Sequence, residues 1–391
     1  MKILYIYNLY QQQGGENLWF ESEPDLFRAH GHEVTVYRRD NNELRQRPLW
    51  RNAALLWEAS WSARSYREVR ALIQEHRPDV AHVYNTIVQI SPSVYYACRD
   101  EGVPVVQSIY NYRLLCPEGT LYRNGKVCEE CSQHSLMRAV RYGCYRRSRL
   151  QSAAVAIMQA YHRWLGTWTK TVACYLVPSP FVRTKLIEGG IPADKIVIKP
   201  NWHEPDPGLR TESDGSFLYA GQLSDKKGTL TMLRAWDLIP DPPLLRIFGD
   251  GPLRHEVESA AARNPRIEYA GKQPHHVVIS YLQRSTAFLV PSEWYEAFPH
   301  TILEAFACAV PVIASRIGTL QDVIADGETG FLFTSGDSAN LARVVAEVRS
   351  RPDAAKRAGA QGRHEYDTRY RGALIYDALL SVYQSVSSAC S

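Results

Sequence analysis

The chain has 391 residues, of which 45% are hydrophobic and 22% charged, and this is the composition of an ordinary globular protein. The balance excludes disordered and fibrous classes, and the length suffices for two domains of roughly 150–200 residues. The formal net charge of +4 is mild, so we expect no nucleic-acid partner.

The first apolar run, residues 1–8, is too short for a secretory signal and predicts a core strand. No run of the sequence reaches the length of a membrane-spanning helix, so we expect a cytoplasmic protein, attached at most peripherally at the inner membrane face. Gly14 and Gly15 follow this strand and would let the backbone approach a phosphate or sugar closely, although such a pair is a simple turn about as often.

Short apolar runs then alternate with longer amphipathic stretches, which predicts parallel strands joined by helices and hence two doubly wound α/β domains. The runs are 2–8, 33–37, 80–84, 103–109, 174–178, 195–199, 216–221, 244–248, 266–270, 286–291, 310–314 and 330–333. Residues 201–215 have linker composition. We therefore predict Rossmann-like domains at 1–200 and 201–371 that face across a ligand-binding cleft.

Four cysteines, Cys116, Cys128, Cys131 and Cys144, lie in a predicted insertion of the first domain at about 112–150. A hairpin with an Asn-Gly turn is expected between the first two. A hairpin that delivers one thiolate to a C-x2-C pair is typical of a zinc ribbon, so a structural zinc is one interpretation. Four free thiols are the alternative.

Between Cys131 and Ile187 the chain contains no Asp or Glu but many Arg, Lys, Tyr and Trp residues. Apolar residues recur at helical spacing there, at positions 153, 157, 160, 164 and 168. Such a helix could lie on an anionic membrane surface or hold an acidic substrate. A helix whose apolar face packs on the core is the equally weighted alternative.

The second domain opens with a strand and the loop Gly221-Gln-Leu-Ser-Asp-Lys-Lys-Gly228. A fixed ammonium there, with Lys227 as the candidate, would stabilise the charge that develops on a departing diphosphate. A solvated lysine pair is the alternative. Gly249-Asp250-Gly251 lacks the third glycine of the dinucleotide fingerprint, which disfavours a nicotinamide dehydrogenase.

The run Glu296-Ala-Phe-Pro-His-Thr-Ile-Leu-Glu304 places two carboxylates on either side of a predicted helix start at Pro299. With Glu296 on the loop and Glu304 in the helix, they would lie roughly 8–12 Å apart. This span suits a nucleotide sugar whose diphosphate lies at the positive helix end. Two solvated glutamates are the alternative.

Together these motifs resemble glycosyltransferase family 4, the retaining enzymes of the GT-B architecture. The resemblance covers nearly the whole chain: 14–16, 78–82, 221–228, 248–252, 291–305 and 327–330. It implies that Glu296 contacts the donor sugar, Lys227 its diphosphate and Glu304 its ribose. It also implies a nucleoside-diphosphate sugar donor, UDP- or GDP-linked, a glycan or lipid-linked glycan acceptor, and no catalytic metal.

The resemblance implies further contacts. The donor side comprises Gly14, Gly15, Gln222, Lys226, Gly249, Asp250, Ala297, Phe298 and Pro299, and the acceptor or sugar side comprises Glu16, His82, Asn85 and Tyr110. The C-terminal helix, about 372–391, is expected to pack back on the first domain.

Three positions depart from the family pattern: Gln222 and Tyr110 stand where the family often has Arg and His, and Phe298-Pro299 stands where Phe-Gly is commoner. Alternative functions are a sugar-nucleotide epimerase, a noncatalytic nucleotide-sugar sensor and a nucleic-acid-binding zinc-ribbon protein.

Overall fold

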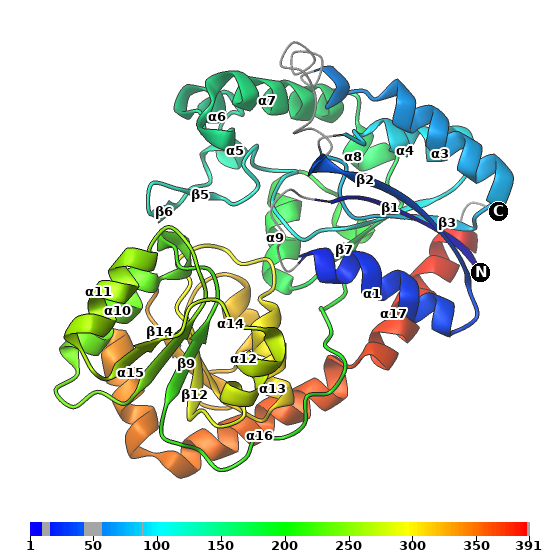
Figure 1. The fold of residues 1–391 in the computed structure, drawn as a ribbon. Coiled ribbons are helices and arrows are strands. Elements are labelled where there is room, and N and C mark those ends of the chain that lie inside the picture. The colour runs from blue at the N-terminus through cyan, green and yellow to red at the C-terminus, as the bar shows by residue number, and fades with distance from the viewer. Residues whose placement is uncertain (10–15, 43–56, 88, 389–391) are drawn as a thin grey trace. The chain divides into compact units, whose positions relative to one another are not determined.

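The computed structural model describes residues 1–9, 16–42, 57–87 and 89–388. The chain divides into two compact units (Figure 1). The first unit comprises Met1–Leu121, Cys128–Lys199 and Tyr376–Ser391, and the second comprises Tyr122–Val127 and Pro200–Ile375. The short hairpin that we placed in the first-domain insertion therefore clusters with the second unit.

The first unit contains a six-stranded parallel sheet in the order β2-β1-β3-β4-β7-β8. Its strands are β1 Lys2–Leu9, β2 Glu33–Asp40, β3 Val80–Val83, β4 Val105–Ser108, β7 Cys174–Val177 and β8 Ile196–Ile198. Its helices are α1 Glu16–Ala29, α3 Ala63–His76, α4 Ser93–Asp100, α5 Glu130–Gln133, α6 Met137–Tyr142, α7 Arg149–Trp164, α8 Thr167–Lys170 and α9 Pro180–Glu188, with short 3-10 turns η3 Tyr145–Arg147 and η4 Ala193–Lys195.

The start of α9 shows how the sequence sets these boundaries. The Ser179 side chain accepts a hydrogen bond from the backbone N–H of Val182 at 3.2 Å, and Pro180 occupies the first helical position. Both features are favoured there because the first N–H groups of a helix lack intrahelical partners.

The second unit contains another six-stranded parallel sheet, in the order β11-β10-β9-β12-β13-β14. Its strands are β9 Phe217–Ala220, β10 Leu245–Phe248, β11 Ile267–Tyr269, β12 Ala287–Val290, β13 Val312–Ser315 and β14 Gly330–Phe333. Its helical elements are η5 Asp225–Lys227, α10 Thr229–Leu238, α11 Arg254–Arg263, α12 His275–Leu282, α13 His300–Ala307, α14 Thr319–Val323, α15 Ser338–Ser350 and α16 Pro352–Arg369. This strand order is that of a dinucleotide-type Rossmann sheet, and the direction of winding reverses between β9 and β12.

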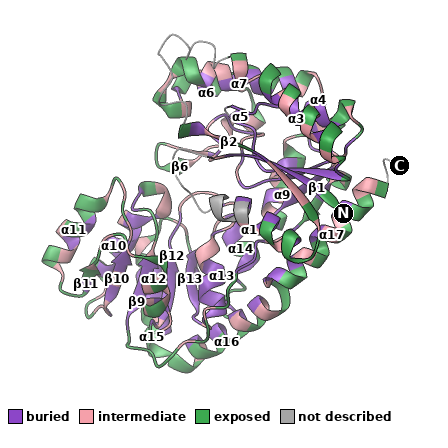
Figure 2. Ribbon diagram, turned by 45° about the vertical axis from the view of Figure 1, so that its right-hand side comes forward, coloured by how far each residue is buried: buried purple, intermediate pink, exposed green. Residues whose placement is uncertain are grey.

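Both faces of this second sheet are covered, so its strands are buried (Figure 2). Phe217 and Tyr219 of β9 pack in one hydrophobic core with α10 and α15, whereas Leu218 packs in the opposite core with α13 and α16. Alternate residues of one strand thus reach different cores, as the two-residue repeat of a β-strand requires.

The remaining elements are the hairpin β5 Tyr122–Arg123 and β6 Lys126–Val127, and the C-terminal helix α17 Gly372–Ser388. The hairpin turns at Asn124 and Gly125, both with positive φ, as an Asn-Gly turn predicts. From Tyr376 onward α17 belongs to the first unit. All twelve predicted strands are present, so the expectation of two doubly wound α/β domains is confirmed.

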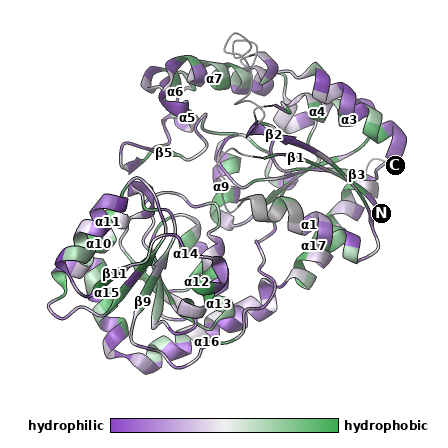
Figure 3. Ribbon diagram, viewed as in Figure 1, coloured by the Kyte–Doolittle hydropathy of each residue, from purple (hydrophilic) through white to green (hydrophobic). Residues whose placement is uncertain are grey.

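One helical prediction was wrong. Helix α7 ends at Trp164, and Trp168 lies in the separate helix α8. Ile157 and Trp164, which we grouped on one apolar face, have 63% and 80% of their surface exposed, and the buried face of α7 carries Val155, Met158 and others instead. Helix α7 therefore does pack one face on the core, but that face is not made of the residues that we grouped. The hydrophobic stretches of α7 are visible in Figure 3.

Candidate functional site

The winding reversal of the second sheet places two loops beside each other, one after β9 and one after β12. Lys227, at the end of η5, and Glu296, on the loop after β12, form an ion pair with Nζ and Oε1 2.5 Å apart. The Ser292 hydroxyl donates a second hydrogen bond to Glu296 Oε1 at 2.6 Å. Two residues predicted to act together are therefore in contact at the position where open α/β sheets bind ligands.

The Glu296 side chain is almost fully buried. Burial alone would raise the pKa of Glu296, but the charge of Lys227 and the hydrogen bonds from Lys227 and Ser292 outweigh it and hold the pKa below its ordinary value of 4.5. Glu296 is therefore a carboxylate at neutral pH, able only to accept hydrogen bonds, as a contact to sugar hydroxyls requires.

The close approach of the two loops depends on Gly228. Its φ is +69°, and a Cβ built there would lie 1.8 Å from the carbonyl oxygen of Pro291. Only glycine fits a backbone in this conformation at this distance. The sequence motif therefore ends in glycine because Lys227 must be held against the end of β12.

The other residues of the second unit that we predicted to contact the sugar donor lie near this pair in the sequence, but they differ in exposure. Gln222 and Asp250 are exposed, while Lys226 is half-buried with its ammonium 4.7 Å from the centre of the Trp294 ring. Gly249 has a φ of +147°, and a Cβ there would lie 1.8 Å from the carbonyl oxygen of Gly221. The loops after β9 and β10 are thus packed backbone to backbone.

Helix α13 begins one residue later than predicted. Pro299 is the residue before the helix, because its ψ of 117° is extended, and His300 is the first helical residue. Ala297 and Phe298 are half-buried on the loop that leads into it. The predicted placement of Glu296 on the loop and Glu304 within the helix is correct.

Glu304 lies in a different environment from Glu296. It is 5% exposed, and its Oε1 is 2.9 Å from Nε2 of His275 and 3.7 Å from Nε2 of His300. Burial would raise the pKa of Glu304, but the hydrogen bond from His275 and the nearby histidines hold it below its ordinary value. Sequence reasoning missed these histidines, although His300 lies four residues before Glu304 and therefore shares its helix face.

In the first unit, His82 does not have the exposure expected of an acceptor-side residue. It is fully buried, and its ring nitrogens are hydrogen-bonded to the hydroxyls of Tyr383, at 2.6 Å, and Ser108, at 2.8 Å. These contacts hold the ring inside the core, because β3 is a central strand, buried on both faces. The acceptor-side role of His82 stays a prediction.

Asn85 and Tyr110 are also buried, but each keeps 9% of its surface exposed. Asn85 donates to the carbonyl oxygen of Asn8 at 2.9 Å, and the Tyr110 hydroxyl is 3.3 Å from the ammonium of Lys199. Gly14, Gly15 and the Glu16 side chain lie outside the described residues. The acceptor-side roles of Asn85, Tyr110 and Glu16 stay predictions.

The four cysteines form no disulfide bonds and are gathered around Cys131. Burial, together with the neighbouring thiols of Cys116, Cys144 and Cys128, raises the pKa of Cys131 to about 12. Among the described residues, the four cysteines do not form a group whose potential metal-ligand atoms all lie within 4.8 Å of one another. His203, His300 and Glu304 do. The structural zinc on the cysteines stays a prediction.

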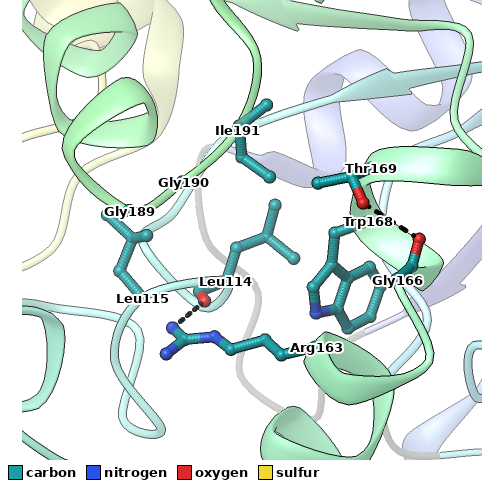
Figure 4. Close-up of a pocket in the computed structure, with 9 residues that line it drawn as sticks. All are labelled: Leu114, Leu115, Arg163, Gly166, Trp168, Thr169, Gly189, Gly190 and Ile191. Atoms are coloured by element: carbon teal, nitrogen blue, oxygen red, sulfur yellow. Dashed lines mark hydrogen bonds between the residues drawn. The ribbon is translucent and has the colours of Figure 1, made fainter.

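A small cavity of about 210 Å³ lies in the first unit, next to α8 and the end of α9 (Figure 4). Its lining residues are Leu114, Leu115, Arg163, Gly166, Trp168, Thr169, Gly189, Gly190 and Ile191. Arg163 donates a hydrogen bond to the carbonyl oxygen of Leu114 at 2.7 Å across one wall. None of the predicted site residues lines this cavity.

Among the helices that the structure describes, none combines the length and the hydropathy needed to cross a bilayer.

Comparison with known proteins defines the class. Residues 202–365 match the profile of the glycosyl transferases group 1, and residues 25–202 match that of the glycosyl transferase 4-like domain. The chain therefore belongs to the family 4 glycosyltransferases, as its motifs predicted.

Two curated relatives illustrate the similarity. The alpha-maltose-1-phosphate synthase of Mycolicibacterium smegmatis is 32% identical over 185 residues, which are 44% of this chain and 48% of the relative. The 2-deoxystreptamine N-acetyl-D-glucosaminyltransferase of Niallia circulans is 28% identical over 190 residues, 46% of this chain and 48% of the relative. The chain thus matches about half the length of these relatives.

Solved structures share the fold over the full chain. HepE of Anabaena in complex with UDP aligns with a TM-score of 0.70 at 16% identity, covering 98% of this chain and 100% of HepE. Sucrose-phosphate synthase from Thermosynechococcus elongatus aligns with a TM-score of 0.71 at 17% identity, covering 99% of both chains. The fold is GT-B.

Proposed function

We propose that this chain is a retaining hexosyltransferase that moves a sugar from a nucleoside-diphosphate sugar to a glycan or lipid-linked glycan in cell-surface polysaccharide synthesis. The observation that carries the proposal is the contact between Lys227 and Glu296 at the winding reversal of the second sheet. The relative HepE, which was solved with UDP and with UDP-glucose, supports a UDP-sugar as the first donor to test, with GDP-sugars second.

The proposed roles follow from charge and position. The Lys227 ammonium would face the diphosphate and stabilise the charge that grows as the bond to the sugar breaks. Glu296 would accept from hydroxyls of the transferred sugar, and Glu304 from those of the ribose. Free N–H groups at the start of α13 would face the diphosphate.

For retention we propose substitution on one face of the sugar. The bond from the anomeric carbon to the leaving phosphate oxygen breaks, the acceptor oxygen bonds to the same face, and the phosphate oxygen takes the acceptor's proton. Glu296 is held by Lys227 and Ser292 and acts by orientation. The Glu296→Gln variant should therefore keep appreciable activity, and a glycosyl adduct trapped on Glu296 would contradict this.

The donor is tested by two measurements on the same protein. Thermal-shift screening against uridine, guanosine and adenosine diphosphate sugars should give a rise in melting temperature with one base only. The protein should then release nucleoside diphosphate slowly from that donor when no acceptor is present. A noncatalytic sensor would release none, and an epimerase would isomerise the donor instead.

Replacing Lys227 tests the catalytic assignment. Lys227→Met should lower the rate of diphosphate release on the order of 100-fold, the effect typical of losing one preorganised charge-stabilising group. Lys356→Met, which removes an equal charge from an exposed position on α16, serves as the control. Equal rates in the two variants would reject the role of Lys227.

We also propose that the α6–α7 segment binds an anionic membrane surface. It exposes six large apolar side chains, Met137, Tyr142, Leu150, Ile157, Tyr161 and Trp164. Exposed arginines lie among them, namely Arg138, Arg141, Arg146, Arg147 and Arg149. Exposed aromatic residues together with cations and no acidic residue are typical of helices that lie in a membrane interface.

Co-sedimentation with vesicles tests this surface. Binding should be strong to vesicles that contain anionic lipid, weaker to neutral vesicles, and reduced at high salt. The Ile157→Ser and Trp164→Ser double variant should lose most of this binding, because these side chains are 63% and 80% exposed and their replacement leaves the core intact. Unchanged sedimentation of that variant would reject the proposal.

A further inference from the structure

Three histidines surround the buried carboxylate of Glu304 in the second unit. His203 comes from the segment between β8 and β9, His275 begins α12, and His300 begins α13 one helical turn before Glu304. Their contacts form a chain: Nδ1 of His203 is 2.9 Å from Nε2 of His300, which is 3.7 Å from Oε1 of Glu304, which is 2.9 Å from Nε2 of His275.

These separations are close to those of a metal centre. A tetrahedral ion held by nitrogen and oxygen at ~2.0–2.1 Å separates its donor atoms by about 3.3 Å. The observed separations of 2.9, 3.7 and 2.9 Å lie on both sides of that value. Donor atoms of His203, His300 and Glu304 all lie within 4.8 Å of one another, so small rotations suffice to enclose an ion.

The hydrogen bond between the two rings also fits. Because Nδ1 of His203 and Nε2 of His300 are 2.9 Å apart, one of the two nitrogens donates and the other accepts. Neutral imidazole is the form that binds metal. One of the two ring nitrogens that face each other in the His203–His300 pair carries a proton. Moving that proton to the outer nitrogen of the same ring frees the lone pairs of both facing nitrogens, with no net release of protons.

The hydrogen bonds of the described residues do not explain why the His203 side chain is buried. Its side chain is 4% exposed, and its Nε2 is buried without a hydrogen-bond partner. Its backbone, in contrast, is fixed on both sides: the N–H donates to the carbonyl oxygen of Tyr370 at 3.1 Å, and the carbonyl accepts from the Tyr366 hydroxyl at 3.0 Å. The backbone of His203 is thus fixed by helix α16 and the residue after it, while His275, at the other end of the chain of contacts, is exposed.

We propose that His203, His300 and Glu304, completed by His275, form a binding site for a divalent ion of the zinc class, and that the bound ion blocks the donor. Nitrogen and carboxylate ligands in this number are those that Zn²⁺ takes in proteins. The blocking rests on the proposed function, because the ion occupies the carboxylate oxygens that would otherwise accept from the ribose. The site is therefore inhibitory and not part of the transfer chemistry.

The site itself is tested without donor. Equilibrium dialysis of the full chain against buffered zinc should show an ion that is lost in His203→Asn and in His300→Asn, each with at least the ~10–100-fold loss of affinity that even an outer-shell change causes. His276→Asn, next to the site on the exposed side of α12, should bind as the wild type does. Cobalt separates this ion from one on the cysteines, since thiolate ligands add a charge-transfer absorption that nitrogen and oxygen ligands lack.

Unchanged zinc affinity in both histidine variants would overturn the proposed site, whatever the measurements of donor binding show. The blocking is tested separately with the same proteins. Buffered zinc should raise the donor Kd at least tenfold in the wild type and have no effect in His203→Asn, which keeps Glu304 free. Zinc binding without any change in donor affinity would leave the site standing and remove Glu304 from the ribose contact.

Discussion

The ion pair of half-buried Lys227 and buried Glu296 shows how one residue sets the ionisation of another. The carboxylate is kept ionised by its partner and by Ser292, against a burial that favours the neutral acid. Its hydrogen-bond acceptors are therefore available at neutral pH, and Lys227 is the largest of the influences that keep them so. The pair links a stability effect to a functional one, and each can be measured alone.

We predict that Lys227→Met lowers stability in a pH-dependent way. In the wild type the pKa of Glu296 lies below 4.5, so its contribution is complete above that pH and is lost as the pH falls through the lower folded value. In the variant, burial raises this pKa above 4.5, so the penalty grows as the pH rises. We expect a loss of about 1–3 kcal/mol at pH 7 that shrinks at pH 4.

Urea unfolding of the wild type, Lys227→Met and the exposed-site control Lys356→Met at several pH values checks this prediction. The control should differ little from the wild type at every pH. A gap for Lys227→Met that stays constant or widens on acidification would contradict the proposed ionisation of Glu296.

At the scale of elements, the loop after β9 is the tightest part of the site. Gly228 ends η5 and starts α10, and its backbone lies directly against Pro291 at the end of β12. The loop therefore cannot move away from β12 without releasing Lys227 from Glu296. This close packing, and not the conformation of glycine alone, makes position 228 sensitive to substitution.

Two matched glycines separate these causes. Gly228 and Gly271 have φ values of +69° and +67°, but an added Cβ meets a backbone oxygen at 1.8 Å in the first and nothing within 4 Å in the second. Gly271→Ala should cost about 1 kcal/mol for its conformation. Gly228→Ala should cost about 3 kcal/mol or more, with weaker donor binding, because the loop must shift. Equal melting temperatures for the two variants would show that the close approach is not real.

At the scale of the whole molecule, a buried charge network organises the first unit. Glu23 of α1 is fully buried and forms an ion pair with Lys199, just after β8, while the Tyr84 hydroxyl donates to its other oxygen at 2.5 Å. Burial would raise the pKa of Glu23, but the charges of Lys199 and His82 hold it below its ordinary value. The contact joins residues 176 positions apart in the chain.

A double-mutant cycle measures this pair. Lys199→Met and Glu23→Leu should each cost about 3–5 kcal/mol, because each leaves the opposite charge buried without its partner. The double variant should cost less than the sum of the two, with a coupling on the order of 2 kcal/mol. Additive losses in urea unfolding would show that the two charges do not stabilise each other.

The sequence predicted the fold well because the apolar runs of buried parallel strands are distinct from the helices between them. The contact of Lys227 and Glu296 could also be expected, since both follow strand ends. The histidines around Glu304 could not, because His203 comes from a segment of linker composition whose tertiary contacts leave no periodic signal. Whether the apolar residues of α7 are covered stayed open for a related reason, since periodicity identifies an apolar face but not whether anything packs on it.

The C-terminal helix has a consequence for biosynthesis. The Tyr383 hydroxyl lies 2.6 Å from His82 and 3.2 Å from the Tyr5 hydroxyl, in the middle of the first sheet's core. The sheet that is translated first therefore stays unfinished until the last helix has left the ribosome, whereas the sheet built from residues 217–333 can close earlier. A premature stop codon shortly before position 383 would thus damage the opposite end of the chain, and its products should be substrates for proteolysis even with the second unit intact.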